Sequence, residues 1–306
     1  MKNISHKLLR NGIKYMSNNS KSLLLNNTYG IYNGTWKQGN GSIINSINPY
    51  TGNVNATIKT ATVNDYNNMI TKMGNAKKYW MNLPSPKRGE IVRQIGDELR
   101  KYKIHLANII TLETGKIHTE SLGEVQEAID ICDYAVGLSR MHNGSIIPSE
   151  RSNYTLLEKY NPLKKHVGII TAFNFPCAVF FWNTALNFIA GNTQIWKGSE
   201  ITPLTSIACT NIIDKVLNRE NIPGEIASMI IGTGDIGKAM ALDNNIELLS
   251  FTGSTEVGNS VGVEVAKRFG RSILELGGNA ASIVTPNAKL NTALDSILFS
   301  SVGTTG

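Results

Sequence analysis

The chain has 306 residues, of which 41% are hydrophobic and 17% charged, and its formal net charge is +7. This length and composition are typical of a globular protein with one large or two smaller domains. The positive excess lies at the front: residues 1–64 contain seven basic residues and no acidic one, and the other 23 basic residues equal the 23 acidic ones. Because no basic patch recurs after residue 64, the composition argues against a nucleic-acid partner.

Membrane, disulfide-rich and metal-binding classes are also disfavoured. The most apolar stretch, residues 173–190, is interrupted by three asparagines, so it does not predict a membrane span. The three cysteines are widely spaced, which argues against a disulfide framework or a zinc site and favours a reducing compartment. The five histidines show no metal-ligand spacing, and we expect them to be surface or packing residues.

The first 30 residues are expected to form a separate segment. Residues 1–25 contain Lys, Arg and Ser but no acid. Four of their apolar residues lie near helical spacing, namely Leu8, Leu9, Ile13 and Met16. These are features of a mitochondrial transit peptide, whereas the apolar run is too broken for a secretory signal. The alternative is a disordered basic tail, with which a cytoplasmic location is equally compatible.

Residues 31–60 are expected to form short strands, because turn-forming pairs such as Asn33-Gly34 separate short apolar runs. The spacing then becomes helical, beginning with a potential capping box from Thr62 to Asp65. The predicted helices cover residues 62–80, 87–103 and 121–140. The glycine, prolines and alternating apolar residues of segment 142–166 predict a hairpin.

From residue 166 apolar strands alternate with helices. The predicted strands cover residues 166–172, 193–196, 226–231, 246–251 and 272–276. The predicted helices cover residues 178–190, 203–218, 236–242 and 254–269. This alternation predicts an α/β fold with a parallel sheet covered on both faces. Such sheets bind ligands beyond the carboxyl ends of their strands, so the turns that follow the strands are the candidate site.

The first two of these turns carry polar side chains. Asn174 follows the first strand, where its amide could donate to a developing oxyanion or simply cap the turn. Lys197 and Glu200 follow the second strand, where they could reach ribose hydroxyls or remain solvated charges.

The next two turns are rich in glycine. Residues 232–237 match G-x-G-x-x-G, the pattern of a pyrophosphate-binding loop, but they follow the third strand and lack the acid expected at the end of the next one. Gly253 and Ser254 stand at a helix N-terminus, which is also suited to phosphate. Either turn could therefore hold the phosphates of a dinucleotide.

The last predicted strand ends in a carboxylate, Glu275, before two glycines. At the end of an apolar strand it is expected to be partly desolvated, which would raise its pKa and suit a general base. A capping or ion-paired glutamate is the alternative.

Together these segments resemble the NAD(P)-dependent aldehyde dehydrogenase superfamily, from about residue 31 to residue 306. The motifs stand in the family's order: T-A-F-N-F-P at 171–176, W-K-G-S-E at 196–200, F-T-G-S-T-E-V-G at 251–258 and L-E-L-G-G-N at 274–279. Within the superfamily, residues 86–97, 123–140 and 270–279 resemble the antiquitin group, whose members oxidise α-aminoadipic semialdehyde in lysine breakdown.

The resemblance implies roles for the matching residues. Asn174 would donate to the oxyanion, and Glu275 would activate the hydrolytic water. The residues expected to bind NAD are Thr171, Ala172, Phe173, Lys197, Glu200, Gly234, Asp235, Gly253, Ser254 and Leu276. Lys197 would bind the adenosine ribose, Gly234 and Asp235 would lie near the adenosine half, and Gly253 and Ser254 would hold the pyrophosphate. An acid in Glu124–Glu127, with Glu127 favoured, would meet the substrate's amino group.

The resemblance also implies a division of the chain. Residues 31–141 and 167–276 would form the NAD-binding domain, and residues 277–306 the incomplete start of a catalytic domain. Residues 142–166 would be the arm through which subunits pair, in a homo-oligomer expected to be a tetramer.

The family's nucleophilic cysteine stands about 34 residues after the base, which corresponds to roughly position 309 and lies beyond Gly306. Cys177 and Cys209 sit in predicted helices and are expected to be buried packing residues. We therefore expect no turnover of a small aldehyde by the 306 residues alone. The alternative is an inactive chain that binds NAD or pairs with intact subunits.

Overall fold

The computed structural model describes residues 23–24, 29–142, 144–278 and 280–304. The expected transit peptide lies almost wholly outside these residues. The described chain begins with the short strands β1 (Ile31–Tyr32), β2 (Trp36–Lys37), β3 (Ile43–Ile47) and β4 (Val54–Lys59). Three helices follow, α3 (Val63–Asn82), α4 (Ser85–Thr114) and α5 (His118–Met141). The predicted order of short strands and then helices is confirmed.

The capping box at the start of α3 is also confirmed. The backbone N–H of Asp65 donates to Thr62 Oγ1 at 3.2 Å, and the backbone N–H of Thr62 donates to Asp65 Oδ2 at 2.8 Å. The α4 helix is longer than expected and continues to Thr114, where Gly115 ends it with a left-handed φ of 75°.

The second half of the chain builds most of the main sheet. Its strands are β7 (His166–Ile170), β8 (Gln194–Lys197), β9 (Ala227–Ile230), β10 (Ile246–Thr252) and β11 (Arg271–Glu275). The connecting helices are α6 (Ala178–Ile189), α7 (Pro203–Arg219) with the short η2 (Gly224–Ile226), α8 (Gly234–Leu242) and α9 (Thr255–Lys267). The strand order is β11-β10-β7-β8-β9-β1-β2. The strands from β11 to β9 are parallel, which confirms the parallel sheet predicted from the alternation after residue 166. The front strands extend it in the antiparallel sense, because β1 pairs antiparallel with β9 and with β2.

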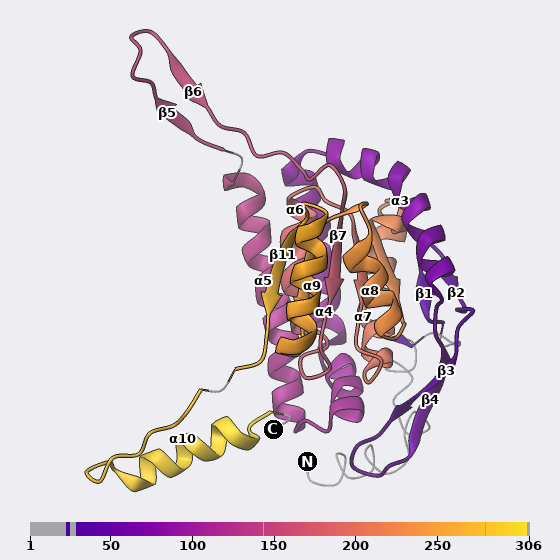
Figure 1. Ribbon diagram of the computed structural model, residues 1–306, viewed down its shortest axis with the longest axis vertical. Helices are drawn as coiled ribbons and strands as arrows, with labels where there is room; N and C mark the ends of the chain where they lie inside the picture. Colours follow the sequence, from indigo (N-terminus) through magenta and orange to yellow (C-terminus); the bar gives the residue numbers. More distant parts are fainter. Residues whose placement is uncertain (1–22, 25–28, 143, 279, 305–306) are drawn as a thin grey trace.

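Alternating side chains of the strands enter two separate cores. Val167, Ile169 and Trp196 belong to the core that contains residues of α4, α5, α6 and α7. Ile170 and Ile195 belong to the core that contains residues of α3, α8 and α9. Helices therefore cover both faces of the central strands, as the apolar runs predicted (Figure 1).

The expected cover is missing at β11. This strand lies at the edge of the sheet, and four of its five residues are exposed. Its only neighbour among the described strands is β10, and α9 is the one described helix with which it has substantial contact. The prediction of a strand shielded on both faces is therefore wrong for β11.

Two further segments extend from this body (Figure 1). The predicted hairpin is confirmed as β5 (Ile146–Pro148) paired with β6 (Thr155–Leu157), and all six strand residues are exposed. The helix α10 (Leu290–Val302) has no buried residue. None of the described helices combines the length and the hydropathy of a membrane span.

Candidate functional site

The strand order creates a switch point between β7 and β10. The chain passes from β7 outward to β8 and β9, and then crosses back to β10 and β11 on the other side of β7. The turns that follow β7 and β10 therefore diverge, which opens the crevice where doubly wound sheets bind nucleotides. The turns after β8, β9 and β11 lie at the same carboxyl edge of the sheet, because these strands run parallel to β7 and β10.

The turn after β7 combines a buried residue with exposed ones. Thr171 is buried, and its Oγ1 accepts a hydrogen bond from Trp196 Nε1 at 3.0 Å. Ala172 is half-buried, whereas Phe173 and Asn174 are exposed. The Asn174 amide has no hydrogen-bond partner among the described residues, so the alternative role as a cap is not observed. The Thr171 hydroxyl is buried and accepts from Trp196, whereas the exposed side chains of this turn are those of Phe173 and Asn174.

The first turn of α6 is instead capped from another helix. Glu124 of α5 accepts hydrogen bonds through Oε1 from the backbone N–H groups of Cys177 (2.7 Å) and Ala178 (3.2 Å). Its Oε2 receives a hydrogen bond from Lys116 Nζ at 2.6 Å, and both side chains are fully buried. Sequence reasoning missed this cluster, because a Lys and a Glu eight residues apart across a helix break form no local pattern.

The turn after β8 brings Lys197 and Glu200 together. Their side chains form an ion pair at 3.2 Å, in which Lys197 is buried and Glu200 remains exposed to solvent. The predicted pair is therefore adjacent in space, with the carboxylate at the surface of the carboxyl edge.

The turn after β9 lies two strands away from the switch point. α8 begins at Gly234, two residues earlier than expected, and Gly234 and Asp235 are exposed. A Cβ on Gly237 would lie 4.0 Å from Lys197 Cδ, so this helix packs against the Lys197 side chain. The G-x-G-x-x-G motif thus borders the Lys197 turn rather than the crevice between β7 and β10.

The turn after β10 presents the N-terminus of α9 at the switch point. Ser254 is the N-cap, and its Oγ accepts from the Val257 N–H at 3.3 Å, which leaves the hydroxyl proton free to donate. The Gly253 N–H donates to the Glu275 carbonyl at 3.1 Å, and a Cβ on Gly253 would lie 2.6 Å from Phe251 Cζ. This position therefore accepts a larger residue only if the Phe251 ring moves.

The turn after β11 corrects one expectation. Glu275 is exposed, and its side chain has no hydrogen-bond or ionic partner among the described residues. The predicted desolvation is wrong because β11 is an edge strand whose outer side faces solvent. Leu276 packs over α9, where a Cβ on Gly258 would lie 2.2 Å from its Cδ2.

Glu127 lies on α5, one helical turn beyond the buried Glu124, and it is exposed. Partial desolvation, followed by the negative charge of Glu124, raises the pKa of Glu127 above its ordinary value. Of the two candidate acids, Glu124 is occupied by buried partners, and Glu127 is the one that reaches solvent.

All three cysteines are buried, which confirms the expectation stated for Cys177 and Cys209. Burial raises the pKa of the Cys177 thiol, and it raises that of Cys132 to about 12. Cys209 lies within α7, but Cys177 comes just before the first residue of α6, so its placement inside a helix is corrected. The described residues contain no cluster of three or more potential metal ligands.

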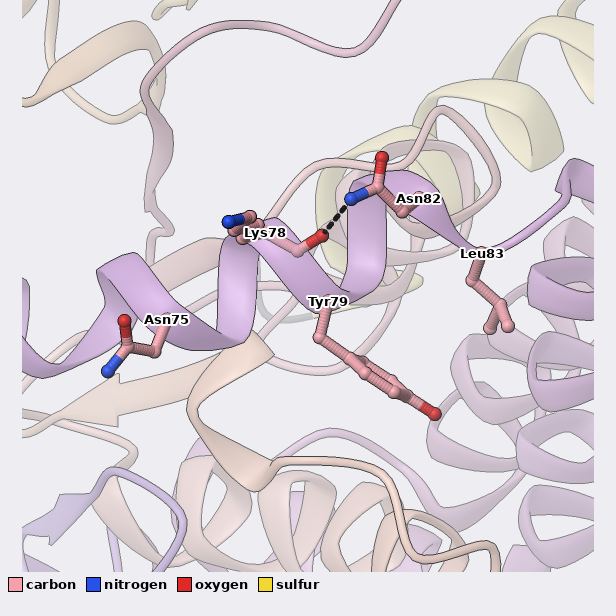
Figure 2. Close-up of a pocket in the computed structure, with 5 residues that line it drawn as sticks. All are labelled: Asn75, Lys78, Tyr79, Asn82 and Leu83. Atoms are coloured by element: carbon pink, nitrogen blue, oxygen red, sulfur yellow. Dashed lines mark hydrogen bonds between the residues drawn. The ribbon is translucent and has the colours of Figure 1, made fainter.

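A shallow pocket lies along the last turns of α3 (Figure 2). It is lined by Asn75, Lys78, Tyr79, Asn82 and Leu83. The neighbouring Lys77 donates to the carbonyls of Leu163 and Lys165, which precede β7. The pocket therefore adjoins the amino end of the sheet, where α/β folds of this kind do not bind their nucleotide.

The β9-β8-β7-β10-β11 order and the turns at its carboxyl edge define a dinucleotide-binding α/β fold. The model of the aldehyde dehydrogenase family matches residues 36–306, and the chain belongs to this family.

Two curated relatives show the same similarity. Aldehyde dehydrogenase family 7 member A1 of Pisum sativum is 51% identical over 274 residues, which are 90% of this chain and 54% of the relative. Alpha-aminoadipic semialdehyde dehydrogenase of Bos taurus is 50% identical over 277 residues, which are 90% of this chain and 51% of the relative. The chain thus spans about half the length of the curated relatives it matches.

Solved structures agree with the fold. An aldehyde dehydrogenase from Brucella melitensis biovar abortus 2308 superposes with a TM-score of 0.84 at 30% identity, covering 91% of this chain and 57% of its own. Betaine aldehyde dehydrogenase from Staphylococcus aureus, in complex with NAD+, gives a TM-score of 0.84 at 28% identity. The match covers 92% of this chain and 56% of the betaine aldehyde dehydrogenase chain.

Proposed function

We propose that this chain supplies the dinucleotide-binding half of an NAD-dependent aldehyde dehydrogenase. The observation that carries the proposal is the switch point between β7 and β10, with Asn174 exposed on one side and Ser254 at a helix N-terminus on the other. The similarity to betaine aldehyde dehydrogenase in complex with NAD+ supports the choice of cofactor.

The residues at the carboxyl edge fit such a cofactor. The free Ser254 hydroxyl proton and the backbone N–H groups at the start of α9 are suited to a pyrophosphate. A Cβ on Gly253 would meet the Phe251 ring, so glycine allows the backbone to keep this position at the start of α9. Lys197 and the exposed Glu200 carboxylate offer a donor and an acceptor to ribose hydroxyls, with Gly234 and Asp235 alongside. Thr171, Ala172, Phe173 and Leu276 would border the nicotinamide half.

NAD, when bound, accepts the hydride of the aldehyde. The Asn174 amide has no hydrogen-bond partner in the described part of the chain and would donate to the oxyanion that develops on the aldehyde oxygen. Glu275 would accept a proton from the hydrolytic water, for which its exposed carboxylate is accessible. The family's nucleophile corresponds to a position outside the 306 residues, so we expect these residues alone to bind NAD without turnover.

For the substrate, we propose α-aminoadipic semialdehyde. The 50% identity to the bovine enzyme of that name supports this choice. Glu127 is exposed on α5 and would pair with the substrate's amino group. In steady-state assays of a chain that includes the family's nucleophile, Glu127→Gln should raise KM for an amino-bearing aldehyde. The KM for a simple alkyl aldehyde should stay unchanged.

We also propose that the β5–β6 hairpin pairs subunits in a homo-oligomer, and that residues 1–30 direct the protein to mitochondria. The hairpin supports pairing because Ile146 is 76% exposed and Leu157 78% exposed. Light scattering of a Leu157→Lys variant should show smaller particles than the unsubstituted chain.

The proposal that residues 1–30 direct the protein to mitochondria is tested by fusing them to a fluorescent protein. A fusion that stays in the cytoplasm would contradict the mitochondrial location.

The test of the cofactor site compares two glycines by calorimetric titration with NAD. Gly253→Ala should weaken binding at least about tenfold, because the added Cβ would meet the Phe251 ring and shift the backbone that precedes α9. Gly234→Ala should change it less than about threefold, because a Cβ there meets open space. The reverse pattern would place the phosphates at residues 232–237, and a folded chain that binds no NAD would refute the proposal.

A further inference from the structure

The Lys116–Glu124 ion pair is buried completely and touches the turn between β7 and α6 at two points. Glu124 Oε1 accepts from the N–H groups of Cys177 and Ala178, while Lys116 Nζ lies 3.6 Å from the centre of the Phe175 ring. Asn174 precedes Phe175 directly. The ion pair therefore contacts the turn directly after Asn174, the candidate oxyanion donor.

The α6 helix depends on this pair for its cap. Its N-cap residue, Cys177, makes no side-chain capping bond of its own. Glu124 supplies both an acceptor for the free N–H groups and a negative charge at the positive end of the helix dipole. Lys116 balances that charge in a place where neither side chain meets water, so removing one partner leaves the other buried and unpaired.

We propose that Lys116 and Glu124 are positioning residues, which hold the turn after β7 so that Phe173 and Asn174 face the switch point. What this turn binds rests on the proposed function. How the turn is held does not, because the contacts of Glu124 and Lys116 are independent of any ligand. Exposed Asn174 has no hydrogen-bond partner among the described residues, so its direction depends on how the turn is held. Glu124 holds its backbone at Cys177, and Lys116 contacts the Phe175 ring.

A second buried glutamate provides a matched control. Glu113, at the end of α4, accepts from the N–H groups of Leu204 (2.9 Å) and Thr205 (2.7 Å) and so caps α7 in the same manner. Both glutamates are buried and both cap a helix, but they hold different helices, and Glu113 has no ion-pair partner among the described residues. Glu113→Gln should leave the β7 turn unchanged.

The first measurement is the labelling rate of each cysteine by a thiol reagent in the 306-residue chain, located by mass spectrometry. In Glu124→Ala, Cys177 should react at least about tenfold faster, because its N–H loses the acceptor that holds it in place. Cys132 should keep its rate and so report that the rest of α5 stays folded. Glu113→Gln should not accelerate Cys177.

The second measurement compares calorimetric affinities for NAD and AMP. AMP would engage the Lys197 turn alone, whereas NAD would also engage the turn after β7. Glu124→Ala should weaken NAD binding about tenfold and change AMP binding less than about twofold, whereas general destabilisation would weaken both. In the double variant Lys116→Met, Glu124→Gln, the amide oxygen can still cap α6 with no charge left buried, and both readouts should largely recover.

Unchanged Cys177 labelling together with an unchanged NAD-to-AMP affinity ratio in Glu124→Ala would overturn the inference, as would equal acceleration of Cys177 and Cys132. If the unsubstituted chain binds no NAD, the proposed function fails. The labelling of Cys177 then still decides whether Glu124 holds the turn.

Discussion

Lys197 Nζ lies 3.2 Å from Glu200 Oε2 and 3.1 Å from the Gly198 carbonyl, so two acceptors direct the ammonium toward the carboxyl edge of β8. The Lys197 side chain is 7% exposed, whereas that of Glu200 is 46% exposed. The cation is therefore held in a fixed position by buried surroundings, while its carboxylate partner keeps free acceptor capacity toward solvent. A rigid donor beside an accessible acceptor is suited to recognising vicinal hydroxyls.

Replacing Lys197 with Met should weaken NAD binding about tenfold or more, because a hydrogen bond to a charged group contributes about 1.5–3 kcal/mol. Calorimetric titration measures the effect. Lys101→Met is the control, since Lys101 is 64% exposed on α4. Equal losses in the two variants would show that Lys197 acts only through the net charge.

Glu113 predicts a pH dependence of stability. Burial raises the pKa of Glu113 to about 7, from an ordinary value of 4.5, although Ser46, Leu204 and Thr205 donate hydrogen bonds to it. Between these two pH values the folded chain holds a proton that the unfolded chain has released, so stability falls as the pH rises. The change across this window should be roughly 3 kcal/mol at most.

Glu113→Gln cannot ionise, so this part of the pH dependence should disappear in the variant. Urea unfolding at pH 5 and at pH 7.5 would measure it. The free energy of unfolding of the unsubstituted chain, relative to the variant, should be lower at the higher pH. A difference that does not change with pH would contradict the assignment.

Thr62→Ala should lower the free energy of unfolding by about 1 kcal/mol, because it removes the side-chain half of the capping box at the start of α3. Thr71→Ala in the same helix is the control. The Thr71 hydroxyl is exposed and bonds only to the Asn67 carbonyl of its own helix, so its loss should change stability by less than about 0.5 kcal/mol. Similar losses at both positions would argue that the cap contributes little.

Local patterns predicted most of the elements and the polar residues at the strand ends. Val167 and Ile169 face one core while Ile170 faces the other, which follows directly from the two-residue period of a strand. The capping box at Thr62 could also be predicted, because its two partners, Thr62 and Asp65, lie within one helical turn of each other. The turns after β7, β8 and β10 likewise carried recognisable residues at their expected places.

The antiparallel edge and the solvent exposure of Glu275 could not be read in this way. They depend on which strands become neighbours, and strand order is set by crossovers that join segments far apart in the sequence. The burial of Lys116 with Glu124, and the attachment of Glu124 to α6 more than fifty residues away, have the same origin.

The sequence alone thus determined the alternation of strands and helices, the basic front of the chain and the side chains offered at the strand ends, because these follow from local periodicity and residue chemistry. The tertiary structure decided that β7 and β10 flank the switch point, that Glu127 rather than Glu124 reaches solvent, and that Glu275 is not shielded. The first depends on the order of the strands, and the other two on whether a carboxylate keeps its water. Only contacts between distant segments can set either.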